Sequence, residues 1–413
     1  MTDLATFIAE APLADTHEHL NTEAEYLSGG PDVLQDLFDH YVTADLAVGG
    51  ASPEALKRLQ DAADPDLAGR FLGIRDAWEA VKHTGYGEGV RLTAKRVYGL
   101  DEIVPEVLSA AQIVAEGLRT PGNLKRLLKD VANLSYVQID DFRWECEGDD
   151  FFQYDLNVMS LVCGDVNAEK LHRATGVTAE SLSTLREAID ALFAKWGPRA
   201  VAVKTQHAYS RTLAWSERTD DDVRRILGKT LFAEERTGEE KLALGDWMFA
   251  RCVEAAIAHD LPVKIHTGYY AGHSYMPIER IPAGLLAGLI RTYPKARFVL
   301  MHTAYPYTGE VLTLAKHFPN VFLDLCWAWS IDPLSTRDFV RRAVHAVPSN
   351  KLLAFGGDSF WPSAAVSYSF QARAWLTRAL QAEVDDAFLT EKDAIWLAAR
   401  WMGENQKALF RLP

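Results

Sequence analysis

The stretch that decides the fold is Leu13-Ala14-Asp15-Thr16-His17-Glu18-His19, a short apolar run that ends in two histidines one residue apart. Side chains at positions i and i+2 of a strand point to the same face. Two imidazoles on one face can hold the same metal ion, and imidazole suits zinc, iron, nickel and copper. A lone pair of this kind can equally be a solvated strand end, so the rest of the sequence has to decide.

Short apolar runs rich in branched residues recur along the chain, and several of them alternate with amphipathic helical segments. The eight runs are residues 13–16, 135–139, 154–159, 200–204, 262–265, 297–301, 321–325 and 352–355. Strands that alternate with helices indicate parallel βαβ units. Eight such units predict a (β/α)8 TIM barrel, an α/β fold in which residues 1–413 form a single domain. A doubly wound open sheet is the alternative.

The spacing of the runs is uneven after the first one, where more than a hundred residues of helical periodicity precede the second. In a barrel, insertions between a strand and the following helix lie over the C-terminal face, where active sites are built. We therefore expect residues 20–130 to form a helical insertion that serves as a lid, with a packing appendage or an oligomer contact as the alternative. We expect residues 209–240 to form a charged loop and helix. We expect residues 389–412 to form a pair of helices beside or under the barrel.

Five of the predicted strands end in side chains that can bind a metal. These residues are His17, His19, Lys204, His266, His302 and Asp358. A single histidine after an apolar run is more often an ordinary polar residue than a ligand. Five strand ends that point such groups at one barrel mouth are a pattern that chance placement explains poorly.

On these residues the sequence resembles the amidohydrolase superfamily, whose metal ligands follow the same order of strands. The Thr-Gly after His266, the Gly-Gly-Asp-Ser of residues 356–359 and the Asn-Gln-Lys-Ala-Leu-Phe of residues 405–410 are also similar to that family. The long insertion is similar to the branch that includes the uronate isomerases and the amidohydrolase-2 group. The resemblance implies a metal-dependent TIM-barrel enzyme with one or two divalent ions, zinc first and iron or manganese as alternatives.

The resemblance allows two arrangements of the metal. In the binuclear one, His17, His19 and Asp358 bind the first ion, His266 and His302 bind the second, and a carboxylated Lys204 bridges them. In the mononuclear one, His17, His19, His266 and Asp358 hold one ion, His302 acts as acid or base, and Lys204 remains a cation that binds a substrate carboxylate. Because all six positions are filled, the sequence favours two ions. Asp358 and His302 are the predicted catalytic residues, since a carboxylate at this place can take a proton from water and pass it to the leaving group.

Several further residues near the predicted mouth are candidates for substrate binding. The guanidinium groups of Arg143 and Arg211 could hold a carboxylate, or could form surface ion pairs instead. Tyr209, Trp327 and Trp361 could line an apolar pocket, or could be core residues under the lid. We expect all five to contact a small, partly hydrophobic substrate.

Composition limits the class of protein. The chain has 413 residues, a formal net charge of −14, four widely spaced cysteines and 48% hydrophobic residues. It has no dense basic run, no long apolar stretch and no basic, apolar leader at Met1. We therefore expect a cytoplasmic enzyme that has neither nucleic acid nor membrane as partner. We also expect a small-molecule substrate and a homo-oligomeric state.

The leading hypothesis for function is a metal-dependent hydrolase that acts on an amide, lactone or ester bond. The alternatives are a decarboxylase of aromatic acids or an isomerase of sugar acids on the same metal site, a non-heme di-iron oxygenase on this scaffold, and a metal-binding protein without enzymatic activity. Substrate identity lies outside what these motifs predict, because specificity is set by loops.

Overall fold

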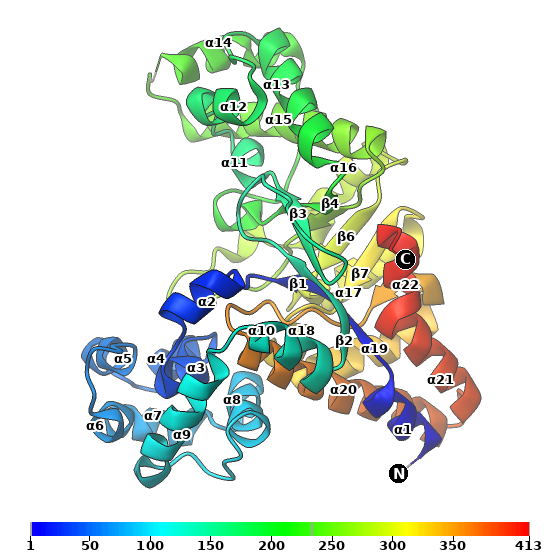
Figure 1. The fold of residues 1–413 in the computed structure, drawn as a ribbon. Coiled ribbons are helices and arrows are strands. Elements are labelled where there is room, and N and C mark those ends of the chain that lie inside the picture. The colour runs from blue at the N-terminus through cyan, green and yellow to red at the C-terminus, as the bar shows by residue number, and fades with distance from the viewer. Residues whose placement is uncertain (1, 233, 413) are drawn as a thin grey trace.

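The fold is an eight-stranded parallel barrel, as the sequence predicts, surrounded by helices (Figure 1). The computed structural model describes residues 2–232 and 234–412. The strands are β1 Leu13–Glu18, β2 Leu134–Ile139, β3 Phe152–Asn157, β4 Ala200–Thr205, β5 Val263–Ile265, β6 Phe298–Met301, β7 Val321–Asp324 and β8 Leu352–Leu353. Each strand pairs in parallel with its neighbour in sequence.

Backbone hydrogen bonds between the first and last segments close the barrel, although β8 is only two residues long. The amide of Thr16 donates to the carbonyl of Phe355 at 3.0 Å, and the amide of Asp358 donates to the carbonyl of His17 at 2.9 Å. The amide of His19 donates to Ser359 at 2.9 Å. This closure brings the end of β1 beside the loop after β8, so His17 and Asp358 become neighbours despite 341 residues of separation in sequence.

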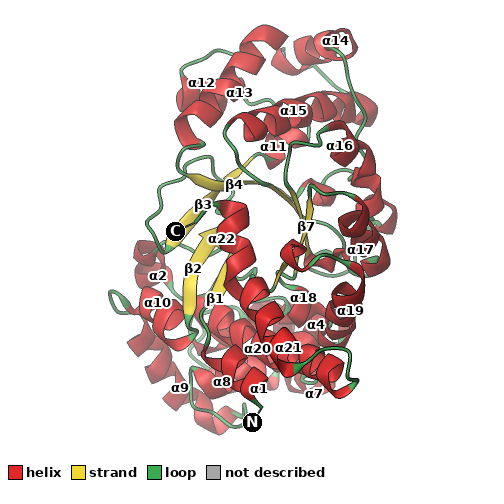
Figure 2. Cartoon of the chain, turned by 90° about the vertical axis from the view of Figure 1, so that its right-hand side faces the viewer, coloured by secondary structure: helices red, strands yellow, loops and turns green. Residues whose placement is uncertain are grey.

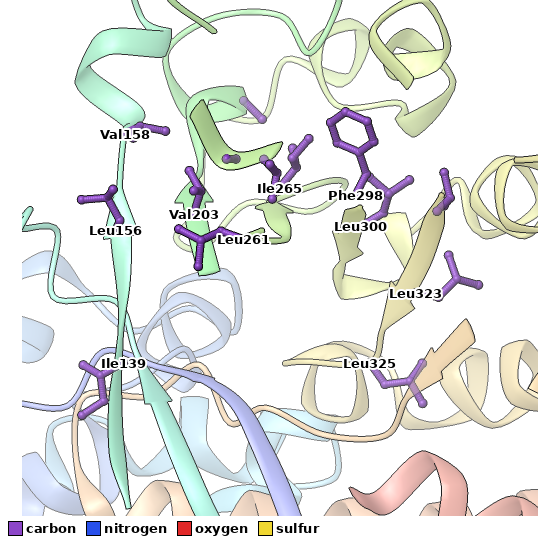
Figure 3. Close-up of a cluster of buried hydrophobic side chains, with 14 of the residues drawn as sticks. Ile139, Leu156, Val158, Val203, Leu261, Ile265, Phe298, Leu300, Leu323 and Leu325 are labelled. Atoms are coloured by element: carbon purple, nitrogen blue, oxygen red, sulfur yellow. The ribbon is translucent and has the colours of Figure 1, made fainter. Parts of the chain in front are cut away.

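The side chains of the strands alternate between the barrel interior and the helical layer outside it. Figure 3 shows Val203, Ile265, Leu300 and Leu323 directed away from the centre of the barrel, where they join the main hydrophobic core. The alternate residues face inward, and some of them are charged. Lys264 donates to the carbonyl of Thr16 at 2.5 Å and to the carboxylate of Asp155 at 2.6 Å inside the barrel. Lys264 and Asp155 therefore form an ion pair inside the barrel.

Helices cover the outside of the barrel and extend it at both ends. They are α1 Asp3–Glu10, α2 Glu23–Gly29, α3 Val33–Phe38, α4 Val42–Val48, α5 Pro53–Leu59, α6 Leu67–Leu72, α7 Arg75–Val81, α8 Gly85–Arg96, α9 Pro105–Leu118, α10 Asn123–Arg126, α11 Met159–Val162, α12 Ala168–Thr175, α13 Leu182–Trp196, α14 Asp220–Leu231, α15 Gly238–Ala258, α16 Ala287–Thr292, α17 Thr308–His317, α18 Ala328–Ile331, α19 Pro333–Ala346, α20 Pro362–Asp385, α21 Glu391–Ala399 and α22 Asn405–Phe410. Many begin at Ser, Thr or Asp caps, as at Thr22 and Thr237, whose hydroxyls accept from the third helical amide. No helix within residues 2–232 and 234–412 is long and apolar enough to cross a bilayer.

The segment between β1 and β2 folds into helices α2 to α10, drawn in blue and cyan in Figure 1. It has a hydrophobic core of its own, which includes Phe38, Trp78 and Leu108. Met301 and Trp327, at the C-terminal ends of β6 and β7, belong to that same core. The insertion therefore packs against the barrel mouth, and its role as a lid stays a prediction that this contact supports.

The C-terminal segment differs from the predicted pair of helices. Helices α21 and α22 are joined by a π-helical turn, Arg400–Glu404, with helical backbone angles throughout, so the segment is one continuous helix. Figure 2 shows α22 across the ring of strands. Leu409 and Phe410 pack against Val201 at the start of β4, so the helix covers the N-terminal end of the barrel, opposite the mouth.

Candidate metal centre

Three predicted ligands meet at the point where the barrel closes. Atoms of His17, His19 and Asp358 that can bind a metal lie within 4.8 Å of one another. The Oδ1 atom of Asp358 is 3.4 Å from Nε2 of His17 and 3.2 Å from Nε2 of His19. The other oxygen of Asp358, Oδ2, lies 3.9 Å from Nε2 of His302. The carboxylate of Asp358 thus stands between the two histidines of β1 and the histidine after β6.

Backbone carbonyls fix the orientation of three of the imidazoles. Nδ1 of His19 lies 2.6 Å from the carbonyl of Asp140, and Nδ1 of His302 lies 2.9 Å from the carbonyl of Cys326. Nε2 of His266 lies 2.9 Å from the carbonyl of Tyr269. A carbonyl oxygen only accepts hydrogen bonds, so each of these nitrogens carries the proton. The second nitrogen of each ring is left with a free lone pair, which is the arrangement of a metal-ligating histidine.

The electrostatics of the site favour neutral imidazoles at His17, His266 and His302 and an ionised carboxylate at Asp358. Burial lowers the pKa of His17 to about 3 and that of His302 to about 4. Burial, together with the neighbouring His302, takes the pKa of His266 well below its usual range. Burial would lower the pKa of His19 as well, but the carboxylate of Asp358 beside it outweighs burial and raises that pKa. Burial alone would raise the pKa of Asp358, but the imidazoles of His17 and His19 beside it hold it well below the usual range.

A cation fits this set of donors. Nε2 of His17 and Nε2 of His302 are buried and have no hydrogen-bond partner among residues 2–232 and 234–412. Each lies across from a carboxylate oxygen of Asp358, and a lone pair facing a carboxylate is stabilised when a positive ion lies between them. Imidazole nitrogen and carboxylate oxygen are ligands that zinc, iron and manganese accept.

Lys204, at the end of β4, lies at the same mouth but in an ion pair. Its side chain is 1% exposed, and its Nζ atom is 3.7 Å from Oδ2 of Asp140. Asp140 is itself fully buried and accepts hydrogen bonds from the side chains of Asn157 at 2.8 Å and Gln206 at 3.1 Å. In the part of the chain that the structure describes, Nζ of Lys204 makes no hydrogen bond, so its three donors remain available to a ligand.

The backbone around the ligands adopts conformations that side chains rarely tolerate. His302, Trp327 and Asp358 have positive φ angles of 65°, 60° and 55°. Such residues cluster at sites where the surrounding structure holds them in place. At Gly357, a Cβ atom would lie 2.0 Å from Oε1 of the buried Glu18, so only glycine allows the chain to pass this close before it reaches Asp358.

A cavity of about 280 Å³ opens at the candidate metal centre. Its wall is formed by His19, Tyr41, Phe142, Met159, Lys204, Gln206, Tyr209, His266, Ala271, Asp358 and Phe360. The ring of His19 stacks on Phe142, with centroids 4.6 Å apart, and on Phe360, with centroids 5.3 Å apart. The cavity is therefore mainly apolar and aromatic, and its polar groups are the candidate ligands, Lys204, Gln206 and the hydroxyls of Tyr41 and Tyr209.

Comparison with known proteins decides the family. Residues 177–410, more than half of the chain, match the family model described as amidohydrolase. This chain belongs to the amidohydrolase family. It is thus a metal-dependent enzyme, as the resemblance of the strand-end residues implied.

Other proteins are similar to this amidohydrolase in sequence or in fold. It is 28% identical over 229 residues to the protein fluG of Emericella nidulans, and the match covers 52% of this chain but 26% of that protein. The chain therefore spans about a quarter of the length of that relative. Solved structures similar to it include the uronate isomerase of Thermotoga maritima, with a TM-score of 0.82, 16% identity and coverage of 98% of this chain and 96% of that one. The glucuronate isomerase of Caulobacter crescentus has a TM-score of 0.81, 16% identity and coverage of 99% and 93%.

Of the residues predicted to bind substrate, two lie at the amidohydrolase site. Tyr209 lines the cavity and stacks on Tyr270, with centroids 4.5 Å apart. Trp327 does not reach the cavity wall, but its buried ring packs edge-on against His302 at 5.3 Å. It therefore supports a candidate ligand from behind.

The other three predicted residues are not on the cavity wall, so their contact with substrate stays a prediction. Arg211 is buried and donates to the carboxylate of Asp246 and to backbone carbonyls, so its guanidinium is already used in packing. Arg143 is half exposed and pairs with Asp141 at 2.7 Å. Trp361 packs beside Tyr26, with centroids 6.4 Å apart, and is absent from the cavity wall.

The sequence analysis missed several residues of the site. Asp140 comes directly after β2, and Lys204 lies at the end of β4, so the strand-end rule applied to β2 would have found Asp140. Phe142 follows two strand-end carboxylates and carried only a weak signal. Tyr41 lies in the insertion, far from any strand, and its hydroxyl donates to the backbone carbonyl of Asp358. Only the docking of the insertion on the barrel brings it there.

Proposed function

We propose that this amidohydrolase is a hydrolase that uses one divalent metal ion to cleave an amide, lactone or ester bond in a small, partly hydrophobic substrate with an acidic group. The observation that carries the proposal is the set of buried imidazoles whose free lone pairs face the carboxylate of Asp358. His17, His19 and Asp358 are the proposed ligands, and His266, whose Nδ1 is free, completes the set. Zinc is the first choice, with iron or manganese as alternatives.

We propose one ion rather than the two that the sequence favoured. The binuclear arrangement needs Lys204 as a carboxylated, anionic bridge. The position of Lys204 beside the buried carboxylate of Asp140 supports a cation instead, because a carboxylated lysine would place two anions next to each other. A di-iron oxygenase needs two metal ions, so a site with one ion does not support that alternative.

The two oxygens of Asp358 support a division of labour. When bound, the divalent ion supplies an activated water and polarises the carbonyl of the substrate. Oδ1 of Asp358 faces His17 and His19 and serves as the ligand, whereas Oδ2 faces His302. Oδ2 accepts the proton of the attacking water and passes it to the leaving group. His302, neutral at pH 7 with its Nδ1 proton held by Cys326, offers Nε2 as a second proton acceptor on that side.

Lys204 and the aromatic wall define the substrate. An ammonium group with three free donors in a mainly apolar cavity is a site for a carboxylate. Phe142, Tyr209 and Phe360 can cover an apolar or ring-shaped part of the molecule. A sugar acid would need partners for several hydroxyl groups. Apart from the candidate ligands and Lys204, the wall offers Gln206 and the hydroxyls of Tyr41 and Tyr209, so we do not favour an isomerase.

Decarboxylation of an aromatic acid is the second candidate, because the same lysine and the same aromatic wall would hold that substrate. Turnover in H₂¹⁸O separates the two reactions. Zinc-loaded protein is incubated with N-acyl amino acids, aryl lactones and hydroxybenzoates, and the products are analysed by mass spectrometry. Hydrolysis places one ¹⁸O atom in the product carboxylate, and release of CO₂ without ¹⁸O in the other product would overturn the hydrolase proposal.

Two variants connect the activity to the site. Replacing His302 with Gln should lower kcat by about 10²–10⁴-fold, because it removes a proton acceptor beside Asp358. Replacing the exposed His317 of α17 with Gln should leave kcat unchanged. Equal activity in the two variants would contradict the role of His302.

A further inference from the structure

A second cavity, of about 400 Å³, lies outside the metal centre and shares its wall with the inner cavity. Tyr41, Ala271 and Phe360 line both spaces. The rest of the outer wall comes from the turn between α3 and α4, from the start of α4 and from the loop after β5. We call this space the outer cavity. Because the two spaces meet at the same three residues, a molecule bound at the metal centre can continue into the outer cavity.

Apart from the candidate metal ligands, each cavity has one charged residue on its wall, and the two residues have opposite signs. Lys204 is the single lysine or arginine on the inner wall, and Asp39 is the single acidic residue on the outer wall. His40, beside Asp39, is neutral because burial lowers its pKa to about 4, and its Nε2 atom finds no hydrogen-bond partner among residues 2–232 and 234–412. The outer cavity thus offers the carboxylate of Asp39 as an acceptor for an ammonium group.

The inner cavity is also small for a complete substrate. Ligand pockets commonly have about 300–1,000 Å³, so a volume of 280 Å³ is at the lower limit. A substrate too large for this volume has to extend past Tyr41 and Phe360 into the outer cavity.

We propose that the substrate has two charged ends, a carboxylate that binds Lys204 in the inner cavity and an amine that binds Asp39 in the outer cavity, joined by an apolar or aromatic segment. This deepens the proposed function and rests on the metal centre for the reaction, but the two-cavity binding can be measured without turnover. Asp39 is then a specificity-determining residue supplied by the insertion.

The test compares the affinity of zinc-loaded protein for two acids by titration calorimetry. Benzoate reaches the inner cavity alone, whereas 4-(2-aminoethyl)benzoate adds an amine that can extend outward. The wild type should bind the amine-bearing acid about tenfold more tightly than benzoate, the gain of one charge-assisted hydrogen bond. Asp39→Asn should remove this advantage.

Two further variants keep the result interpretable. Ala44→Trp fills the outer cavity and should also remove the advantage of the amine. Asp76→Asn takes one charge from the same insertion at a side chain that is 98% exposed, and should retain the tenfold difference. Equal affinity of the wild type for both acids, or an advantage that survives in Asp39→Asn and Ala44→Trp, would overturn the proposal. An advantage that depends on Asp39 in a protein without hydrolytic activity would refute the hydrolase and leave the two-cavity binding in place.

Discussion

Replacing Lys204 with Met tests how the buried lysine contributes to stability and binding. Methionine keeps the length of the side chain but removes the ammonium group, which lies 3.7 Å from Oδ2 of Asp140. Removing one partner of a buried ion pair costs about 3–5 kcal/mol, because it leaves the other charge uncompensated. Here Asp140 keeps hydrogen bonds from Asn157, Gln206 and the amide of Phe142. We therefore expect the free energy of unfolding to fall by about 2–3 kcal/mol.

Binding of an acid should weaken in the same variant. Loss of a charge-assisted hydrogen bond of about 1.5–3 kcal/mol raises the Kd for benzoate by roughly 10- to 100-fold. Urea denaturation measures the stability, and titration calorimetry measures the affinity. The double variant Lys204→Met with Asp140→Asn no longer contains the stranded carboxylate, so it should recover most of the stability but none of the affinity.

The result that would refute this reasoning is loss of metal. If Lys204→Met loses bound metal and activity, and a short carboxylic acid restores both to Lys204→Ala, then Lys204 is an anionic bridge. The ion pair with Asp140 would then not describe the working enzyme.

Two other predictions concern packing and pH. Gly357→Ala should lower the free energy of unfolding by about 2–3 kcal/mol, because the added Cβ would lie 2.0 Å from Glu18. The control Gly309→Ala in α17, whose Cβ would have no atom within 4 Å, should raise the free energy of unfolding by about 0.5 kcal/mol. Urea denaturation measures both changes. Burial raises the pKa of Asp36 to about 6, so the folded protein keeps a proton that the unfolded chain loses above pH 4. In metal-free protein, the stability of the wild type relative to Asp36→Asn should therefore fall by roughly 3 kcal/mol as the pH rises from 4 to 7. A stability difference that does not depend on pH would contradict this prediction.

The barrel was predictable from the sequence because most of its strands are short, largely buried runs rich in apolar residues. The runs around Val203, Leu300 and Leu323 pack outward in the same way, and their ends meet at one mouth by the geometry of the fold. The six strand-end residues from His17 to Asp358 could be named in advance for that reason, and the family match agrees with the resemblance that they carried.

Residues whose position depends on tertiary docking could not be predicted in the same way. Arg211 was expected at the substrate because it follows a strand, but its guanidinium is taken by Asp246, 35 residues later on another element. Tyr41 reaches the cavity because the insertion shares a hydrophobic core with Trp327. Pairing between distant elements leaves no periodic pattern in the sequence. The ion pair of Arg211 and the position of Tyr41 on the cavity wall could therefore be found only from the structure.

The central claim is a single metal ion held by the histidines of β1 and by Asp358, with Lys204 as a cation. Metal analysis by mass spectrometry on purified wild type, His19→Ala and Lys204→Met tests it most directly. We predict one metal ion per chain in the wild type, retention of that ion in Lys204→Met, and its loss in His19→Ala. Two ions per chain that fall to one or none in Lys204→Met, or full occupancy in His19→Ala, would contradict the account.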